Sequence, residues 1–129
     1  MPLDTALEPL FDPALLHISV RSQRRDGRAV DTPVWFLARG DRLYFRTIAT
    51  SPKVARIRAN PAVAVAACTA EGALLGPFSA ARAQVVVADH PMLAAIDAQL
   101  DRKYGDERRA MTELMAQQAQ PLLYVEITF

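Results

Sequence analysis

The stretch that decides the fold is Thr32-Pro33-Val34-Trp35-Phe36, together with Arg46-Thr47 and Ser51-Pro52-Lys53-Val54 downstream of it. This order predicts a buried strand, a tight turn, a second strand, and then a helix whose first turn carries a hydroxyl and a cation. The start of a helix attracts phosphate because its free backbone N–H groups and the positive end of its dipole face the ligand. The segment is therefore a candidate cradle for a phosphate-bearing cofactor.

The same residues are also explained by an ordinary capped surface helix without a ligand. The residue preferences at a helix start, taken alone, favour this explanation over a phosphate site. Ser51 is a good N-cap, Pro52 suits the first helical position, and a lysine there is commonly solvated. Arg46 shifts the balance toward a ligand, because a long cation in an otherwise apolar strand either reaches water or meets an anion. Arg56 and Arg58 either extend a basic rim or form a solvated helix face.

The strand at Thr32–Phe36 has two features that suit a planar ligand. Pro33 lacks a backbone N–H, so one ladder position stays unpaired and a ligand can approach the backbone there. Trp35 is the only tryptophan, and its ring can stack on a flat cofactor. Packing in the core or at a subunit interface is the commoner role for such a residue.

Alternating apolar residues and turn signals on either side of this segment predict about six strands, mostly joined as hairpins. Three or four short helices complete the chain. The expected strands are residues 15–23, 29–38, 42–48, 62–69, 74–88 (interrupted at Gly76-Pro77) and 123–129. The expected helices are 4–11, 51–60, 89–105 and 106–118.

This pattern indicates a mainly β protein with short helices (α+β) and a single domain over residues 1–129. An antiparallel barrel, closed or partly open, accommodates such strands without long exposed edges. We expect two sets of apolar residues on the last two helices to face the core, namely Leu93, Ile96 and Leu100, and Met111, Leu114 and Met115.

Composition excludes several function classes. The formal net charge of +1 gives no field that would favour nucleic acid. Cys68 is the only cysteine, so an intrachain disulfide is excluded, and His17 and His90 have no metal-ligand spacing. No apolar run approaches the roughly 20 residues of a membrane span, and the N-terminus lacks a basic and then apolar leader. We therefore expect no metal and no membrane or nucleic-acid partner, and a cytoplasmic location.

The ordered motifs resemble the pyridoxamine-phosphate-oxidase-like split β-barrel family, specifically its flavin- and deazaflavin-dependent (coenzyme F420) oxidoreductase branch. The resemblance covers nearly the whole chain, and the combined order and spacing are more specific than any single motif. It rests on Thr32-Pro33-Val34-Trp35-Phe36, Leu43-Tyr44-Phe45-Arg46-Thr47, Ser51 to Arg58, Asn60-Pro61, Cys68, Gly72, Gly76-Pro77-Phe78 and Arg102-Lys103-Tyr104-Gly105.

The resemblance implies an antiparallel split β-barrel of the FMN-binding type and a homodimer with the flavin in a groove between subunits. It implies that the strand Asp31–Phe36 lines the isoalloxazine ring, largely through its backbone. It also implies that Arg46 and Thr47, followed by Ser51 and Lys53, hold the phosphate end. The cofactor-binding residues expected in all are Thr32, Pro33, Val34, Trp35, Arg46, Thr47, Ser51, Lys53, Arg56 and Arg58, the last two toward the acidic tail of a deazaflavin.

Three departures from the family pattern bear on the activity. Pro52 stands where the pyridoxamine-phosphate oxidases have an arginine, and their C-terminal substrate-binding segment, with its tryptophan and arginine, is lacking. Vitamin B6 oxidation is therefore not expected. Ala81 stands where this branch often has glycine, which makes close cofactor approach along that strand less certain.

We therefore expect a small dimeric oxidoreductase that binds FMN or coenzyme F420 and transfers hydride to or from a small organic substrate. No residue is supported as a catalytic acid or base. Two alternatives stay open at this stage: a non-catalytic flavin- or haem-binding module for storage or sensing, and a cofactor-free barrel that acts as an interaction protein.

Overall fold

A single antiparallel sheet of seven strands forms the body of the protein in the computed structural model, which describes residues 5–129. The sheet curls into a split β-barrel, with strand order β2-β1-β5-β6-β7-β4-β3. Its strands are β1 (His17–Gln23), β2 (Ala29–Val34), β3 (Leu37–Arg39), β4 (Arg42–Ile48), β5 (Ala62–Cys68), β6 (Ser79–Val85) and β7 (Leu122–Thr128).

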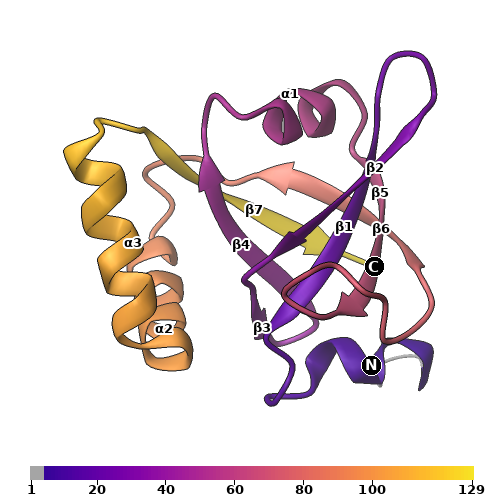
Figure 1. Cartoon of the computed structure of the whole chain (residues 1–129), viewed down its shortest axis with the longest axis horizontal. Helices are drawn as coiled ribbons and strands as arrows, with labels where there is room; N and C mark the ends of the chain where they lie inside the picture. The colour runs from indigo at the N-terminus through magenta and orange to yellow at the C-terminus, as the bar shows by residue number, and fades with distance from the viewer. Residues whose placement is uncertain (1–4) are drawn as a thin grey trace.

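Three α-helices and a short 3₁₀ helix surround this sheet. Helix α1 (Pro52–Ala59) covers one end of the barrel, and the 3₁₀ helix η1 (Thr5–Phe11) lies at the opposite end (Figure 1). Helices α2 (Leu93–Tyr104) and α3 (Asp106–Gln117) stand together on one side of the barrel, beyond β4 (Figure 1). The helical turn expected at 4–11 is confirmed over residues 5–11, and Asp4 lies outside the described residues.

The barrel interior is built by period-two alternation along the strands. On β4, Leu43 and Phe45 are fully buried in the main core, while Tyr44 points to the other face. There Tyr44 packs with residues of α2 in a second apolar cluster. This alternation matters for the site, because it sends the next two residues of β4 to different sides of the sheet.

The single strand expected at 29–38 is wrong, because the chain divides it into β2 and β3 at Trp35-Phe36. The backbone N–H of Phe36 donates to Tyr104 Oη at 2.9 Å, and its carbonyl accepts from Lys103 Nζ at 2.9 Å. Side chains at the end of α2 therefore take the backbone groups that a continuous strand would use in its ladder.

Two other boundaries differ from the expected ones. Strand β6 begins at Ser79 and not near Leu74, which makes only an isolated bridge to Cys68. Helix α2 begins at Leu93, since His90 Nδ1 accepts the N–H of Met92, and Asp89 caps nothing.

The apolar set on α3 was expected to face the core, and this is wrong for Met111 and Leu114, which are 43% and 41% exposed. Arg108 is instead the buried residue of α3. The set on α2 is confirmed for Ile96 and Leu100, which are buried against the sheet.

Candidate functional site

Arg46 and Thr47 are neighbours on β4, and their side chains lie on opposite faces of the sheet. Thr47 shares the face of Leu43 and Phe45, and its hydroxyl meets Lys53 of α1. Arg46 shares the face of Tyr44 and pairs with Asp97 of α2. The structure therefore brings Thr47 together with Lys53 and separates Arg46 from them.

Lys53 is a half-buried cation without an acidic partner among residues 5–129. Its Nζ donates to Thr47 Oγ1 at 3.2 Å and stands 5.9 Å from the centre of the Phe45 ring. Burial lowers the pKa of Lys53, and the charge of Arg56 lowers it further. A cation in such surroundings gains from any anion that reaches it.

Ser51 lies directly before α1, and its hydroxyl is buried without a hydrogen-bond partner among the described residues. It occupies the N-cap position, as expected, but its side chain makes no capping bond. A buried hydroxyl left unpaired costs about 1–3 kcal/mol, so its retention needs a reason. The backbone N–H of Lys53 lies in the first turn of α1, where no intrahelical carbonyl is available to accept it, and Pro52 has no N–H of its own.

Arg56 and Arg58 do not join this group. Arg56 Nε donates to the buried Ser22 Oγ at 2.8 Å, which directs it toward β1. Arg58 lines a separate hollow of about 570 Å³, where Arg82 of β6 is also exposed. The two arginines therefore lie on different sides of α1 and do not converge on a common tail.

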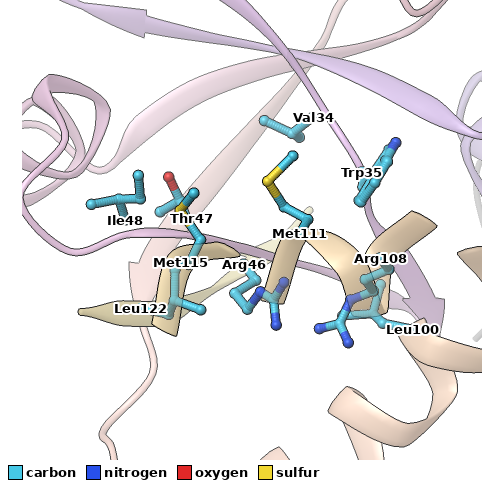
Figure 2. A pocket seen from close by; sticks show the side chains of 10 residues that line it. All are labelled: Val34, Trp35, Arg46, Thr47, Ile48, Leu100, Arg108, Met111, Met115 and Leu122. Carbon is cyan, nitrogen blue, oxygen red and sulfur yellow. The ribbon is translucent and has the colours of Figure 1, made fainter. Parts of the chain in front are cut away.

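A second cavity of about 210 Å³, which we call the outer pocket, lies between β4 and α3. In Figure 2, Val34 and Trp35 lie on one side of it, the guanidinium groups of Arg46 and Arg108 lie on the other, and Met111 lies between them. The lining residues are Val34, Trp35, Arg46, Thr47, Ile48, Leu100, Arg108, Met111, Met115 and Leu122.

An ion network around the buried Arg108 lies next to the outer pocket. Arg108, only 2% exposed, donates to Asp101 Oδ1 at 2.6 Å, to Asp97 Oδ1 at 2.9 Å and to Tyr124 Oη at 2.9 Å. The Tyr124 hydroxyl also bonds Asp97 Oδ1. Burial opposes ionisation of Asp97, but hydrogen bonds from Tyr124 and Arg108 outweigh it and lower the pKa of this carboxyl.

Sequence reasoning missed this network, although one signal was available. Asp97 and Asp101 are four residues apart on one helix, so they share a face, and like charges at that spacing favour a bridging cation. Arg108 on the next helix supplies it.

Val34 and Trp35 border the outer pocket, whereas Thr32 and Pro33 sit earlier on β2, an edge strand paired only with β1. One side of the β2 backbone is therefore free of ladder bonds. The Trp35 ring stacks on the Tyr104 ring, with centroids 4.9 Å apart and planes at 19°. Tyr104 and Lys103 bind the backbone of Phe36, the residue after Trp35, and burial lowers the pKa of Lys103 to about 8.

No family model matches the sequence, and no curated protein matches it either. Solved structures do match its fold. HutZ from Vibrio cholerae, described as a haem storage protein, aligns with a TM-score of 0.71 at 14% identity over 99% of this chain and 90% of its own. A Listeria innocua protein provisionally assigned as a pyridoxamine 5′-phosphate oxidase aligns at 0.64 and 17% identity, over 95% and 89%.

The chain has the pyridoxamine-phosphate-oxidase-like split β-barrel fold. An F420 reductase with the same fold aligns at a TM-score of 0.60 and 19% identity, over 98% of this chain and 94% of its own. The expected fold class is thereby confirmed. Flavin-related and haem-related proteins both occur among these neighbours, so the fold is compatible with more than one cofactor.

Two further observations concern the split barrel over residues 5–129. None of its helices is both long and apolar enough to cross a membrane. No group of three or more histidine, cysteine, aspartate or glutamate side chains in this range is placed to hold a metal ion.

Proposed function

We propose that this chain is a small oxidoreductase that binds FMN or coenzyme F420 and transfers hydride to or from a small organic substrate. The observation that carries the proposal is the pair formed by Lys53, a half-buried cation with no acidic partner among the described residues, and the unpaired Ser51 hydroxyl. Both lie at the first turn of α1, where the free backbone N–H and the helix dipole add to the attraction for a phosphate.

The phosphate end of the cofactor would lie against this turn. Lys53 Nζ already donates to Thr47 Oγ1, so the two groups can contact the same anion from neighbouring elements. Ser51 Oγ would gain the hydrogen bond that it lacks. The residues present therefore fit a phosphate group by charge, by donor type and by an unmet hydrogen-bonding need.

The ring end of the cofactor would lie along the free edge of β2. Thr32 and Pro33 expose backbone there, and the chain then runs through Val34 and Trp35 to the outer pocket. Tyr104 fixes the Trp35 ring by stacking and fixes the adjacent backbone by its hydroxyl. This arrangement offers a rigid flat surface for a tricyclic ring.

A bound flavin or deazaflavin supplies the hydride chemistry, and the protein supplies binding, orientation and electrostatics. We assign no acid or base to the chain. Arg46 faces the outer pocket, next to the strand that would line the ring, and contributes positive charge there and not at the phosphate. Arg56 and Arg58 are separated, so they give no preference for the acidic tail of F420 over FMN.

We further propose that the functional unit is a homodimer. Several large apolar side chains are exposed on the surface and are available to a subunit interface. They are Leu16, Leu74, Leu75, Val87, Met111, Leu114 and Phe129, each between 41% and 63% exposed.

A non-catalytic cofactor-binding module is the second candidate, and the similarity to a haem storage protein favours it. A haem would need an axial ligand. His90 Nδ1 already accepts a backbone N–H, and neither His90 nor His17 lines the outer pocket. The described residues therefore fit a phosphate-bearing flavin better than a haem.

Titration of the apo-protein with FMN, F420 and haem in parallel tests the choice, followed by visible absorbance and fluorescence. We expect saturable binding of FMN or F420 and reduction of the bound cofactor by an electron donor. Saturable binding of haem alone would contradict the proposal. A bound flavin that no donor reduces would favour the storage or sensing module.

A further inference from the structure

Arg46 lies at the base of the outer pocket with its hydrogen-bonding capacity unused. Its side chain is 11% exposed, and its one charged partner among the described residues is Asp97, at 3.8 Å. That distance is too long for a hydrogen bond. A guanidinium carries five N–H donors, so this group enters the pocket with all of them available.

The surrounding charges explain why Arg46 forms only a long ion pair with Asp97 and no hydrogen bond. Asp97 Oδ1 already accepts from Arg108 and from Tyr124, and Arg108 also takes Asp101. The two carboxylates are thus matched to the fully buried arginine. Burial lowers the pKa of Arg46 and the charge of Arg108 lowers it further, although Tyr124, Asp97 and Asp101 act in the opposite direction.

The remaining walls of the outer pocket are apolar and adaptable. Met111 and Met115 come from α3, and Val34 and Trp35 come from the opposite side (Figure 2). Methionine side chains adjust to a range of shapes and make favourable contacts with aromatic rings. The volume of about 210 Å³ is below the range of about 300–1,000 Å³ for drug-sized ligands, which limits the occupant to roughly one small ring.

We propose that the outer pocket binds a small organic carboxylate with an apolar or aromatic body, and that Arg46 is its anion-binding residue. A guanidinium matches the two oxygens of a carboxylate with two parallel bonds. A phosphate fits less well, because its additional oxygens would face methionine and valine without partners.

The position of the pocket indicates that the bound carboxylate would be the substrate. Val34 and Trp35 border the pocket, and they are the last residue of β2 and the residue after it, in the segment that would line the flavin ring. A molecule held by Arg46 would therefore lie beside the ring, and not beside the phosphate end at Lys53. This step rests on the proposed function and deepens it by naming carboxylates as the substrate class.

Benzoate and its neutral analogue benzamide are suitable probes, because they differ mainly in charge. Isothermal titration of the full-length chain with each probe measures affinity, and the emission of Trp35, the only tryptophan, reports occupancy of this pocket. For a molecule of this size we expect a Kd on the order of 1 mM or tighter for benzoate. Benzamide and inorganic phosphate should bind at least about tenfold more weakly.

Two pairs of variants locate the binding. Arg46→Gln should weaken benzoate binding at least about tenfold, while Arg82→Gln, which removes an exposed arginine from the other hollow, should leave it unchanged. Met111 is 43% exposed, so substitutions there should leave the fold intact. Met111→Glu should also weaken benzoate binding, by charge repulsion, and Met111→Gln should not.

Equal affinity for benzoate and benzamide, or benzoate affinity unchanged in both Arg46→Gln and Met111→Glu, would overturn the proposal. Lys53→Ala separates it from the proposed function, because that variant should lose affinity for FMN and keep affinity for benzoate. Benzoate binding in a chain that binds neither FMN nor F420 would leave the pocket assignment in place and remove the proposed function.

Discussion

Lys53→Ala is the substitution with the most definite expected effect. The ammonium group is half-buried and meets one hydroxyl, Thr47 Oγ1, so it has donors to spare for a phosphate. A hydrogen bond to a charged group contributes about 1.5–3 kcal/mol. Its loss should therefore weaken FMN binding by roughly 10- to 150-fold.

The comparison of FMN with riboflavin isolates the phosphate contact. Both carry the same ring, and only FMN carries the phosphate, so Lys53→Ala should affect FMN and leave riboflavin almost unchanged. The assay is titration of the apo-protein followed by flavin fluorescence, with Arg82→Ala as a matched control outside the site.

The stability of the variant should change little. Removal of the Lys53–Thr47 bond costs about 0.5–1.5 kcal/mol, and removal of a desolvated cation beside Arg56 offsets part of that cost. Unchanged FMN affinity in a folded Lys53→Ala protein would refute the phosphate assignment. An equal loss for FMN and riboflavin would show that the lysine acts on the ring or on the fold.

Three other outcomes are expected. Burial lowers the pKa of Lys103 to about 8 from 10.5, so the unfolded chain binds more protons between these values, and the stability of the fold should rise with pH from about 8 to 10. Chemical denaturation should show a smaller rise in Lys103→Met than in the native chain, where the lowered pKa of Lys53 still contributes. An equal rise in both proteins would contradict this expectation. Arg108→Ala should lower the free energy of unfolding by about 2–4 kcal/mol, because it removes a buried guanidinium that bonds two carboxylates and a hydroxyl. The control Arg109→Ala, at an exposed position, should change it by no more than about 0.5 kcal/mol. Urea unfolding measures both values, and similar values for the two variants would argue against the network. Sedimentation at micromolar concentration should give the mass of a dimer, and a monomer that retains cofactor would count against a site shared between subunits.

The parts of the fold that depend on local chemistry could be predicted from the sequence. Helix α1 begins at Pro52, after the N-cap Ser51, and ends at Ala59, before Asn60-Pro61, as expected, because capping and proline geometry act within a few residues. The Asp26-Gly27 pair is a turn signal in the sequence, and the structure has a turn there in which Gly27 adopts φ +84°, a conformation that glycine adopts readily.

The parts of the fold that depend on contacts between distant residues could not be predicted from the sequence. The break at Trp35-Phe36 results from Lys103 and Tyr104, which lie 67 and 68 residues away from Phe36 in the chain. No local propensity reports such contacts.

The same distinction applies to the candidate site. Thr47 and Lys53 are six residues apart, and their contact follows from a strand that runs directly into a helix. Arg46 was grouped with them because of its position in the sequence, but alternation along β4 turns it to the other face, where Asp97 and Arg108 determine its surroundings. The orientation of α3 was missed for a similar reason, since Arg108 is buried by two acidic residues of another helix.

A crystal structure of the full-length chain with bound FMN tests the central claim most directly. The account predicts the phosphate within hydrogen-bonding distance of Lys53 Nζ and Ser51 Oγ at the start of α1, with the ring along Thr32–Trp35. A phosphate bound at Arg58 and Arg82, or a ring placed away from β2, would contradict it.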